Sequence, residues 1–399
     1  MKQSPESNKI KIGAIYPLSG SLAPVGREIR RALSLALDIV NNEFHLPLPL
    51  AQTIGLPRLK NRKIQLVFAD TKGDPAQGRI EANRLIEQEG VVALIGAYQS
   101  NVTEVASLIS EAKNIPFLNP DSSAPSLTKR NFDWFFRTGP DDQLFTDLFF
   151  ELFRFLQSRG ENLSQFGILS EDSEFGLEAS AIEVRSIRRF GAEITDIEIY
   201  GQPIPSLPLL IQRIRSSNPQ VVFGQQFLSD AIQAVQALKA IGWFPDGWVV
   251  QDAGYVVPEF LQSVGEDGNY IISRAAWALG LGQLKPLVKK VNQLYQSRYG
   301  EDMNETNARS FTGFFVLADA INRAGNTDPY AIREGLKQTS IPGEKLIMPW
   351  RGVRFNQQGQ NVLADGMLVQ ILDREYRIIW PPNLAETGVI WPAPSWNER

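Results

Sequence analysis

The stretch "LIGAYQSNVTEVASLISEAK", residues 94–113, decides the fold. Its apolar start ends at Gly96, and the small polar cluster at residues 98–101 comes next. From Val102 onward the apolar residues recur at helical spacing. The pattern predicts a buried strand that ends in a polar turn, with a helix beginning at that turn. Ser100 then stands where the helix starts, and the question is what it does there.

The same alternation of strand and helix recurs along the chain. Short apolar runs rich in β-branched residues, each with a helical pattern after it, occur at residues 11–16, 63–70, 165–170 and 219–224. Strands that alternate with helices predict parallel sheets covered on both faces. Two successive sets of strands predict two similar α/β lobes, the expected fold class.

The last third of the chain shows a different pattern. Residues 284–300, 308–325 and 328–340 have helical patterns with no clear strand between them. Helices without a sheet of their own must pack onto an existing lobe, so the chain is expected to cross between lobes more than once. Residues 352–362 and 367–382 then predict a ribbon of strands.

These patterns predict the domain boundaries. The first lobe is expected to comprise residues 9–140 and 275–350, and the second residues 141–274 and 351–385. The Pro- and Trp-rich residues 386–399 are expected to form an irregular tail.

Composition excludes several classes of protein. The 399 residues carry a net charge of −4 with no long basic stretch, which argues against a nucleic-acid partner. Without cysteine, the chain has no disulfide, iron–sulfur cluster or zinc–thiolate site. His45 is the only histidine, so a histidine-rich metal site is excluded, and we expect neither metal nor cofactor.

Two readings of the cellular location stay open at this point. No apolar run reaches the ~18 residues that a membrane span needs. Residues 1–11 are polar and lack the apolar core of a signal peptide. Either the protein is cytosolic, or a signal is absent from this chain.

Ligands of open parallel sheets bind beyond the carboxyl ends of the strands, so residues just after each strand carry the function. Every charged residue in those predicted positions is acidic: Asp70, Asp121, Glu171, Asp172, Glu174 and Asp252. A serine nucleophile at Ser100 lacks a base in reach and a G-x-S-x-G elbow. Nucleotide-binding glycine motifs are absent, and nothing specific supports paired catalytic carboxylates. We therefore expect no catalytic residue, and reversible binding remains.

Two interpretations of Ser100 stay open from the residues alone. Its hydroxyl and the first amides of the helix suit a carboxylate ligand, because these amides have no partner within the helix. Alternatively, Ser100 or Asn101 only caps the helix, a contribution of ~1 kcal/mol. The polar residues 121–123 after the next strand favour the binding interpretation.

At this point residues 11–41, 68–86 and 90–128, with "SEDSEFG", "AIGW" and "SFTGFFVLADAINRAG" further on, carry a resemblance. The chain resembles the branched-chain amino-acid binding proteins of bacterial ABC importers, in order and over nearly its whole length. The resemblance implies a type I periplasmic binding protein fold: two Rossmann-like lobes, three crossovers, and a cleft that shuts on the solute.

The resemblance also implies roles for particular residues. Ser100 matches the serine that binds the ligand carboxylate, while Asp121 and Ser123, beside Ser122, match the loop that receives the ammonium. The family usually has a small residue where Asp121 stands, so either only its carbonyl counts or its side chain changes specificity. Phe175 matches an aromatic cover, Asp252 the acid that pairs with the ammonium, and Gln226 or Phe227 a further aromatic position. Tyr16 and Tyr98 are expected to line the side-chain pocket.

The implied function is that of a periplasmic or extracytoplasmic solute-binding protein, with the signal peptide or lipid anchor absent from this chain. It is expected to be a monomer that binds a neutral, aliphatic amino acid such as leucine, alanine or proline and delivers it to an ABC permease. One alternative is the same fold binding an amide or an aromatic carboxylate. Another is a two-lobed α/β enzyme.

Overall fold

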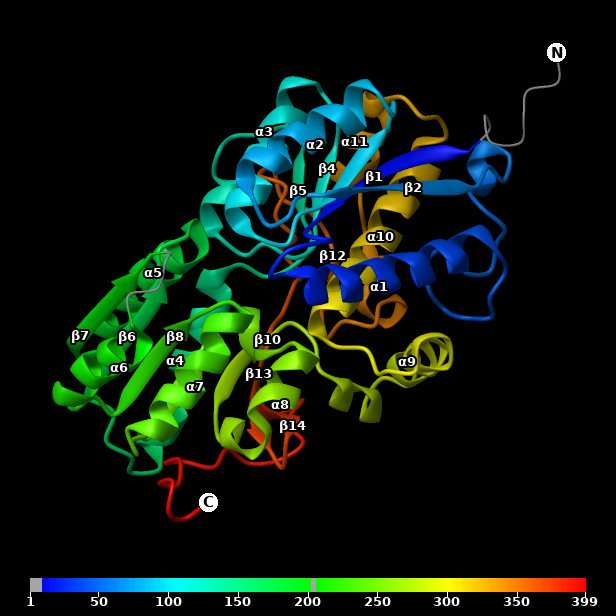
Figure 1. Cartoon of the computed structure of the whole chain (residues 1–399). Helices are drawn as coiled ribbons and strands as arrows, with labels where there is room; N and C mark the ends of the chain where they lie inside the picture. Colours follow the sequence, from blue (N-terminus) through cyan, green and yellow to red (C-terminus); the bar gives the residue numbers. More distant parts are fainter. Residues whose placement is uncertain (1–8, 202–205) are drawn as a thin grey trace. The chain divides into compact units, whose positions relative to one another are not determined.

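The chain passes three times between two units, which the computed structural model describes over residues 9–201 and 206–399 (Figure 1). Unit 1 comprises Met1–Pro140 and Lys285–Asp365, and unit 2 comprises Asp141–Leu284 and Gly366–Arg399. The first crossing lies where the sequence pattern puts it. The other two differ, since residues 275–284 belong to unit 2 and residues 351–365 to unit 1.

Unit 1 is built on a five-stranded parallel sheet in the order β2-β1-β3-β4-β5. Its strands are β1 (Ile10–Tyr16), β2 (Ile64–Asp70), β3 (Ala93–Gly96), β4 (Phe117–Asn119) and β5 (Phe135–Arg137). The order places β1 next to β3 and lines up the carboxyl ends of β1, β3 and β4 at one edge.

Helices cover this sheet, as the alternating pattern predicts. The helices of unit 1 are α1 (Ala23–Asn41), α2 (Pro75–Glu87), α3 (Ser100–Ala112), α9 (Pro286–Tyr299), α10 (Glu305–Ala324) and α11 (Pro329–Lys337). In Figure 1, α2 and α3 lie together on one side of the sheet, while α1 packs against α10 on the other. Helix α10 is buried along most of its length, which explains the apolar run in its sequence.

Unit 2 has a seven-stranded sheet in the order β14-β13-β10-β9-β8-β6-β7. Its strands are β6 (Gln165–Glu171), β7 (Glu193–Tyr200), β8 (Val221–Gln225), β9 (Gly247–Val250), β10 (Ile272–Ala275), β13 (Met367–Leu372) and β14 (Glu375–Trp380). The first five are parallel, and the hairpin β13–β14 adds two antiparallel strands at the edge. The helices are α4 (Asp142–Ser158), α5 (Glu174–Phe190), α6 (Leu207–Ser216), α7 (Leu228–Ala240) and α8 (Pro258–Val264).

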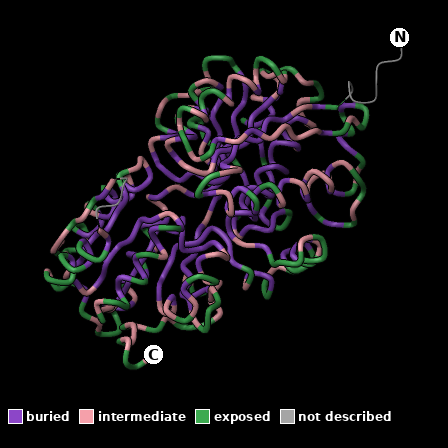
Figure 2. Tube along the Cα trace, viewed as in Figure 1, coloured by how far each residue is buried: buried purple, intermediate pink, exposed green. Residues whose placement is uncertain are grey.

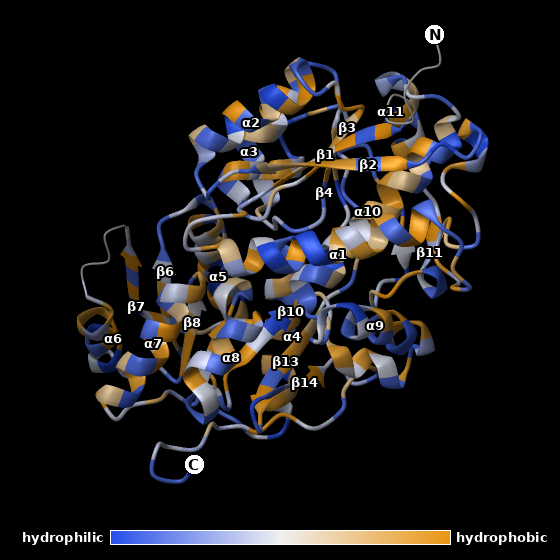
Figure 3. Ribbon diagram, turned by 45° about the vertical axis from the view of Figure 1, so that its right-hand side comes forward, coloured by the Kyte–Doolittle hydropathy of each residue, from blue (hydrophilic) through white to orange (hydrophobic). Residues whose placement is uncertain are grey.

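Each sheet lies in its own apolar core. Figure 2 shows buried backbone along the strands of each unit, and Figure 3 shows hydrophobic residues concentrated on the same strands. In unit 2 the core is largely aromatic: Phe150 of α4 stacks on Phe166 of β6 and Phe223 of β8, with ring centroids 6.2 and 6.1 Å away. Packed rings of this kind hold α4 firmly against the sheet.

One expectation about the last third was wrong. Residues 352–362 do not join a ribbon with residues 367–382, because β12 (Gly352–Val353) pairs with β11 (Ile341–Pro342) in unit 1. The tail after residue 386 has no helix or strand, as expected, but it packs on unit 2. The Trp391 ring lies against Gly247, where a Cβ atom would come within 2.3 Å of it.

Replacing Trp391 with alanine is expected to lower the free energy of unfolding by about 1–3 kcal/mol, because the indole packs against Phe153 of α4 in the aromatic core of unit 2. The matched control is Ile390→Ala. Ile390 is 41% exposed, and its two bonds to Gln370 use only its backbone. Urea unfolding followed by circular dichroism measures both variants. Equal stability of the two would contradict the packing role of Trp391.

Candidate functional site

In unit 1, the loops after β3 and β4 are joined by buried hydrogen bonds. Gly96 ends β3 at φ +149°, where a Cβ atom would lie 2.3 Å from the carbonyl oxygen of Ile15, so only glycine fits. The Asn119 side-chain amide, at the end of β4, donates to the carbonyls of Gly96 and Ala97 at 2.9 and 3.2 Å. These bonds fix where the two loops stand relative to each other.

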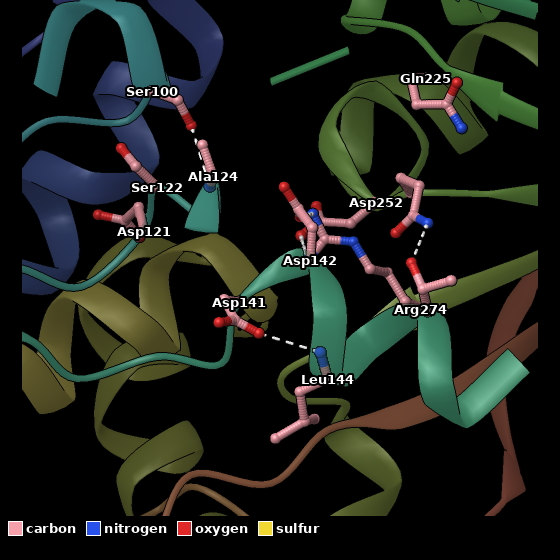
Figure 4. Close-up of polar contacts among 12 residues, drawn as sticks. Ser100, Asp121, Ser122, Ala124, Asp141, Asp142, Leu144, Gln225, Asp252 and Arg274 are labelled. Atoms are coloured by element: carbon pink, nitrogen blue, oxygen red, sulfur yellow. Dashed lines mark hydrogen bonds and ion pairs between the residues drawn. The ribbon is translucent and has the colours of Figure 1, made fainter. Parts of the chain in front are cut away.

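Ser100 is the first residue of α3 and does not cap it. The N-cap position belongs to Gln99, whose side chain makes no capping bond, and Asn101 accepts only from the amide of Val102. The capping interpretation of Ser100 and Asn101 is therefore wrong. The buried Ser100 Oγ accepts from the backbone amide of Ala124 at 3.4 Å (Figure 4). The Ser100 hydroxyl and the amides of Ser100 and Asn101 thus lie together at the start of α3, where Gln99 makes no side-chain capping bond.

The Ser122 hydroxyl, in the loop after β4, forms hydrogen bonds to the loop after β3. It lies 3.0 Å from the carbonyl oxygen of Ala97 and 3.1 Å from that of Tyr98. It also pairs with Thr103 Oγ1 at 2.6 Å, and Thr103 in turn accepts from the amide of Ala97. Sequence reasoning missed Thr103, although its spacing three residues after Ser100 places it on the first turn of the helix.

Asp121 turns its side chain into unit 1. Its carboxylate accepts from Ser310 Oγ at 3.0 Å and from the Tyr16 hydroxyl at 3.3 Å. Burial and the neighbouring Asp121 carboxylate raise the pKa of Tyr16 well above its usual value, so the phenol stays protonated and donates. Of the two alternatives for Asp121, these contacts favour the one in which its side chain points away from a ligand.

Two buried arginines hold the carbonyls of the same loop. Arg309 of α10 donates to the carbonyls of Pro120 and Asp121, and its guanidinium pairs with Glu305 at 3.2 Å. Arg137 of β5 donates to the carbonyl of Ala124 at 2.7 Å. A guanidinium already at the Asp121 carbonyl disfavours a second cation there. Ser123 is buried within this loop, and Tyr98 is half-buried.

In unit 2, an aromatic pair stands at the ends of β6 and β8. Phe175 is the second residue of α5 and Phe227 precedes α7, with ring centroids 5.9 Å apart. Gln226 faces the interior instead: its amide donates to the carbonyl of Leu169 at 2.6 Å and its oxygen accepts from the Tyr255 hydroxyl at 2.6 Å. Between the two alternatives for this position, the structure favours Phe227 as the residue beside Phe175.

Asp252 follows β9 in a strained backbone conformation, with φ +62° and ψ −116°. Residues held in such conformations cluster at functional sites, where the surrounding structure enforces them. Its carboxylate lies 3.7 Å from the guanidinium of Arg274, which also pairs with Asp142 at 3.0 Å (Figure 4). The guanidinium carbon lies 4.1 Å from the centroid of the Phe145 ring.

Arg274 is a charged residue of this region that the sequence analysis overlooked. It stands in β10, within a run that the sequence presents only as an apolar strand. It is buried, and it lies 5.8 Å from the ring centroid of Phe175. Unit 2 thus brings together Phe175, Asp252 and Arg274. In unit 1 the structure brings together Tyr16, Asp121 and Ser122, with Ser100 nearby.

A buried acid lies next to this group. Glu183 of α5 accepts from the side-chain amides of Gln225 and Gln251 at 2.6 and 2.7 Å. Burial raises the pKa of Glu183 well above its usual value, and the charge of Asp142 adds to the effect. Burial therefore favours the protonated form of Glu183 more than it would for an exposed carboxyl group.

The described residues hold no cluster of three or more potential metal ligands, and none of their helices is long and apolar enough to cross a bilayer. His45 is exposed on the loop after α1.

Comparison with known proteins decides the family. A family model described as "Periplasmic binding protein" matches residues 9–374. The chain belongs to the periplasmic binding protein family. A relative from Brucella suis biovar 1, named Leu/Ile/Val-binding protein homolog 7, is 24% identical over 397 residues, which covers 98% of this chain and 96% of the relative.

Solved structures of this family share the fold. The leucine-binding protein LivK from Thermotoga maritima superposes with a TM-score of 0.80 at 17% identity, over 94% of this chain and 99% of that one. A solute-binding protein from Rhodopseudomonas palustris BisB5, in complex with 3,4-dihydroxybenzoic acid, superposes with a TM-score of 0.75 at 15% identity, over 98% and 100%. The expected type I periplasmic binding protein fold is thereby confirmed.

Replacing Glu183 with glutamine is expected to change how stability depends on pH. Below about pH 4.3 both the folded and unfolded states carry the Glu183 proton. At higher pH the unfolded state loses it while the folded state keeps it, so the wild-type protein loses up to ~1.4 kcal/mol of stability per pH unit until the folded state also ionises. Glutamine keeps an oxygen for both amides and has no such dependence.

Urea unfolding of wild-type protein and Glu183→Gln at pH 5, 6, 7 and 8 tests this. The stability difference in favour of the variant should grow with pH. The matched control is Glu178→Gln on the same helix, where the residue is only partly buried. A constant difference between Glu183→Gln and wild type across the series would mean that Glu183 is ionised in the folded protein.

Proposed function

We propose that this chain is the extracytoplasmic solute-binding protein of an ABC importer, a monomer that binds a neutral amino acid and presents it to the membrane permease. Family membership supports the solute-binding role, and the names of the relatives cited above include Leu/Ile/Val- and leucine-binding proteins. The ligand is taken to be aliphatic, and closure of the two units on it would signal occupancy to the permease.

The observation that carries the proposal is the start of α3 in unit 1. The N-cap residue Gln99 makes no capping bond with its side chain, and the Ser100 hydroxyl lies at the first residue of the helix. Such a group of donors suits a carboxylate without needing a positively charged side chain. The opposite end of an amino acid requires an anion, which Asp252 of unit 2 supplies.

We propose Ser100, Ser123, Tyr98, Phe175, Phe227 and Asp252 as the ligand-binding residues. Tyr16, Asp121, Ser122 and Gln226 bond within their own units, so we assign them to holding the loops in place. No bond of the ligand is made or broken in this proposal. Mass spectrometry of a solute recovered after incubation should therefore find it chemically unchanged.

A second candidate is a solute that has a carboxylate but no amine. It is favoured by Arg274, whose guanidinium already faces Asp252, and by the relative bound to 3,4-dihydroxybenzoic acid. In this case Asp252 needs no ammonium partner. A panel that contains both amino acids and aromatic acids separates the two candidates.

Ser100→Ala is expected to weaken binding of the preferred amino acid about 10–100-fold, because a hydrogen bond to a charged carboxylate is lost. Asn101→Ala is the matched control on the same turn: its side chain bonds only to the adjacent amide, so binding should stay within about threefold of wild type. Titration calorimetry against an amino-acid panel measures both. Equal affinities of the two variants would remove Ser100 from the site.

Asp252→Asn is expected to weaken amino-acid binding about 30-fold or more, since it leaves the ligand ammonium without its counter-charge. Asparagine tolerates the positive φ at this position, so the loop conformation is kept. The same calorimetric panel shows the result. Undiminished affinity for amino acids would speak for the amine-free solute.

A further inference from the structure

The ends of α4 and α5 in unit 2 carry a cluster of exposed arginines. Helix α4 has one arginine near its end and another as its C-cap residue, and α5 has three in its last two turns. This arginine patch comprises Arg154, Arg159, Arg185, Arg188 and Arg189, all of them exposed. Residues three and four apart on a helix are neighbours, so the three arginines of α5 lie on one side of it.

Packing brings the ends of the two helices together. Phe150 and Phe153 of α4 pack on the ring of Phe190, the last residue of α5, with centroids 5.3 and 6.2 Å apart. Packed helices have axes about 8–10 Å apart, a distance that two arginine side chains span easily. The Debye length at physiological ionic strength is about 8 Å. A partner therefore meets the arginine patch as one positive surface.

The arginine patch is not neutralised within the described residues, where none of its members forms an ion pair. Other partly exposed arginines do form one, such as Arg298 with Asp38 at 3.0 Å. Glu161 and Glu193 follow the ends of α4 and α5, and neither comes within ion-pair distance of the patch. The patch thus keeps a surplus of positive charge in a chain whose net charge is −4.

The helix dipole accounts for only part of this cluster. A cation in the last turn of a helix interacts favourably with the dipole, and Arg188 and Arg189 stand there in α5. The effect falls off beyond the last turn. Arg154 and Arg185 precede the last turns of their helices, so the dipole does not explain them.

Partly exposed aromatic rings border the arginine patch on the side of α4. The ring of Phe155 lies 5.4 Å from that of Trp380, and the guanidinium carbon of Arg159 lies 5.5 Å from the Phe155 ring. Arginines beside aromatic rings are typical of protein surfaces at the edge of a bilayer. There the rings lie at the level of the headgroups, and the cations meet the phosphates.

The arginine patch lies at the opposite end of the unit 2 sheet from the proposed ligand-binding residues. Helix α5 begins just after β6 and ends just before β7, so its last turn lies at the amino ends of these strands. Phe175 and Asp252 instead follow the carboxyl ends of β6 and β9. A partner bound at the patch therefore does not cover these residues.

We propose that the arginine patch binds the surface of a bilayer that contains anionic phospholipids. A guanidinium group binds phosphate through two parallel N–H donors. Arginines without fixed partners suit a fluid array of headgroups better than a fixed set of carboxylates on a protein. The association is peripheral, since no helix of the described residues is long and apolar enough to cross a bilayer.

Sedimentation of the full chain with large vesicles tests this inference. The vesicles consist of phosphatidylcholine, either alone or mixed with about 40% phosphatidylglycerol to supply the negative surface potential. Wild-type protein is expected to bind only the mixed vesicles at low salt, and about 0.5 M NaCl should release it by screening. The triple variant Arg185→Gln/Arg188→Gln/Arg189→Gln is expected to bind about 100-fold more weakly, about fivefold for each arginine.

The matched control is Arg79→Gln/Arg213→Gln/Arg354→Gln, which removes the same charge from exposed positions on α2, α6 and the segment after β12. These positions are scattered, so vesicle binding should stay within about threefold of wild type. Urea unfolding should give the same midpoint for wild type and both triple variants, which excludes a folding defect as the cause of weaker binding.

Three results would overturn the inference. The first is that wild-type protein does not bind the mixed vesicles, and the second is that both triple variants lose binding equally. The third is that soluble polyglutamate binds the arginine patch more tightly than the mixed vesicles do, which would assign the patch to an acidic protein. Amino-acid binding is measured separately by calorimetry, so the proposed function can fail or stand independently of these results.

Discussion

Loops at the ends of buried parallel strands contain backbone carbonyls and charged side chains that are shielded from water. These groups must find partners inside the protein, and here the partners are buried arginines. In unit 1, Arg137 and Arg309 donate to carbonyls of residues 120–124. In unit 2, Arg274 pairs with Asp142 and Asp252. The other features of the candidate site depend on these three guanidinium groups, since they determine where the loops lie.

This requirement divides the polar residues near the strand ends into two kinds. Ser122, Asp121 and Gln226 use their hydrogen-bonding groups on their own unit. Ser100 accepts a bond from the Ala124 amide at the first residue of a helix, and Asp252 lies near Arg274 in a strained backbone conformation. A residue of the first kind keeps the site in shape, and a residue of the second kind is a candidate to meet a ligand. Sequence alone does not separate them, because both kinds are small polar residues in the same loops.

Periodicity was enough to predict the α/β class, the first crossing and most strands, because the buried parallel strands read as continuous apolar runs. It failed where a strand is very short, and where two residues in contact lie far apart in the sequence. The two-residue strands β11 and β12 are too short to show a period. Arg309 lies 188 residues from the carbonyl of Asp121 that it binds, and Arg274 stands in an apolar run without a visible partner. A polar contact between residues far apart in the chain leaves no local sequence pattern. The sequence analysis therefore found only acidic residues after the strands and overlooked Arg309 and Arg274.

The overlooked cation changes how the acid of unit 2 must be understood. A single buried carboxylate without a nearby cation would be protonated when no ligand is bound, since desolvation disfavours its charged form. A carboxylate fully paired with an arginine would stay ionised but would have no attraction left for an ammonium. In unit 2 two carboxylates lie near one buried guanidinium, and the positive charge of Arg274 favours the ionised form of both. The charge state of Asp252 therefore depends on Asp142 and Arg274 as well, and no single residue of the three determines it.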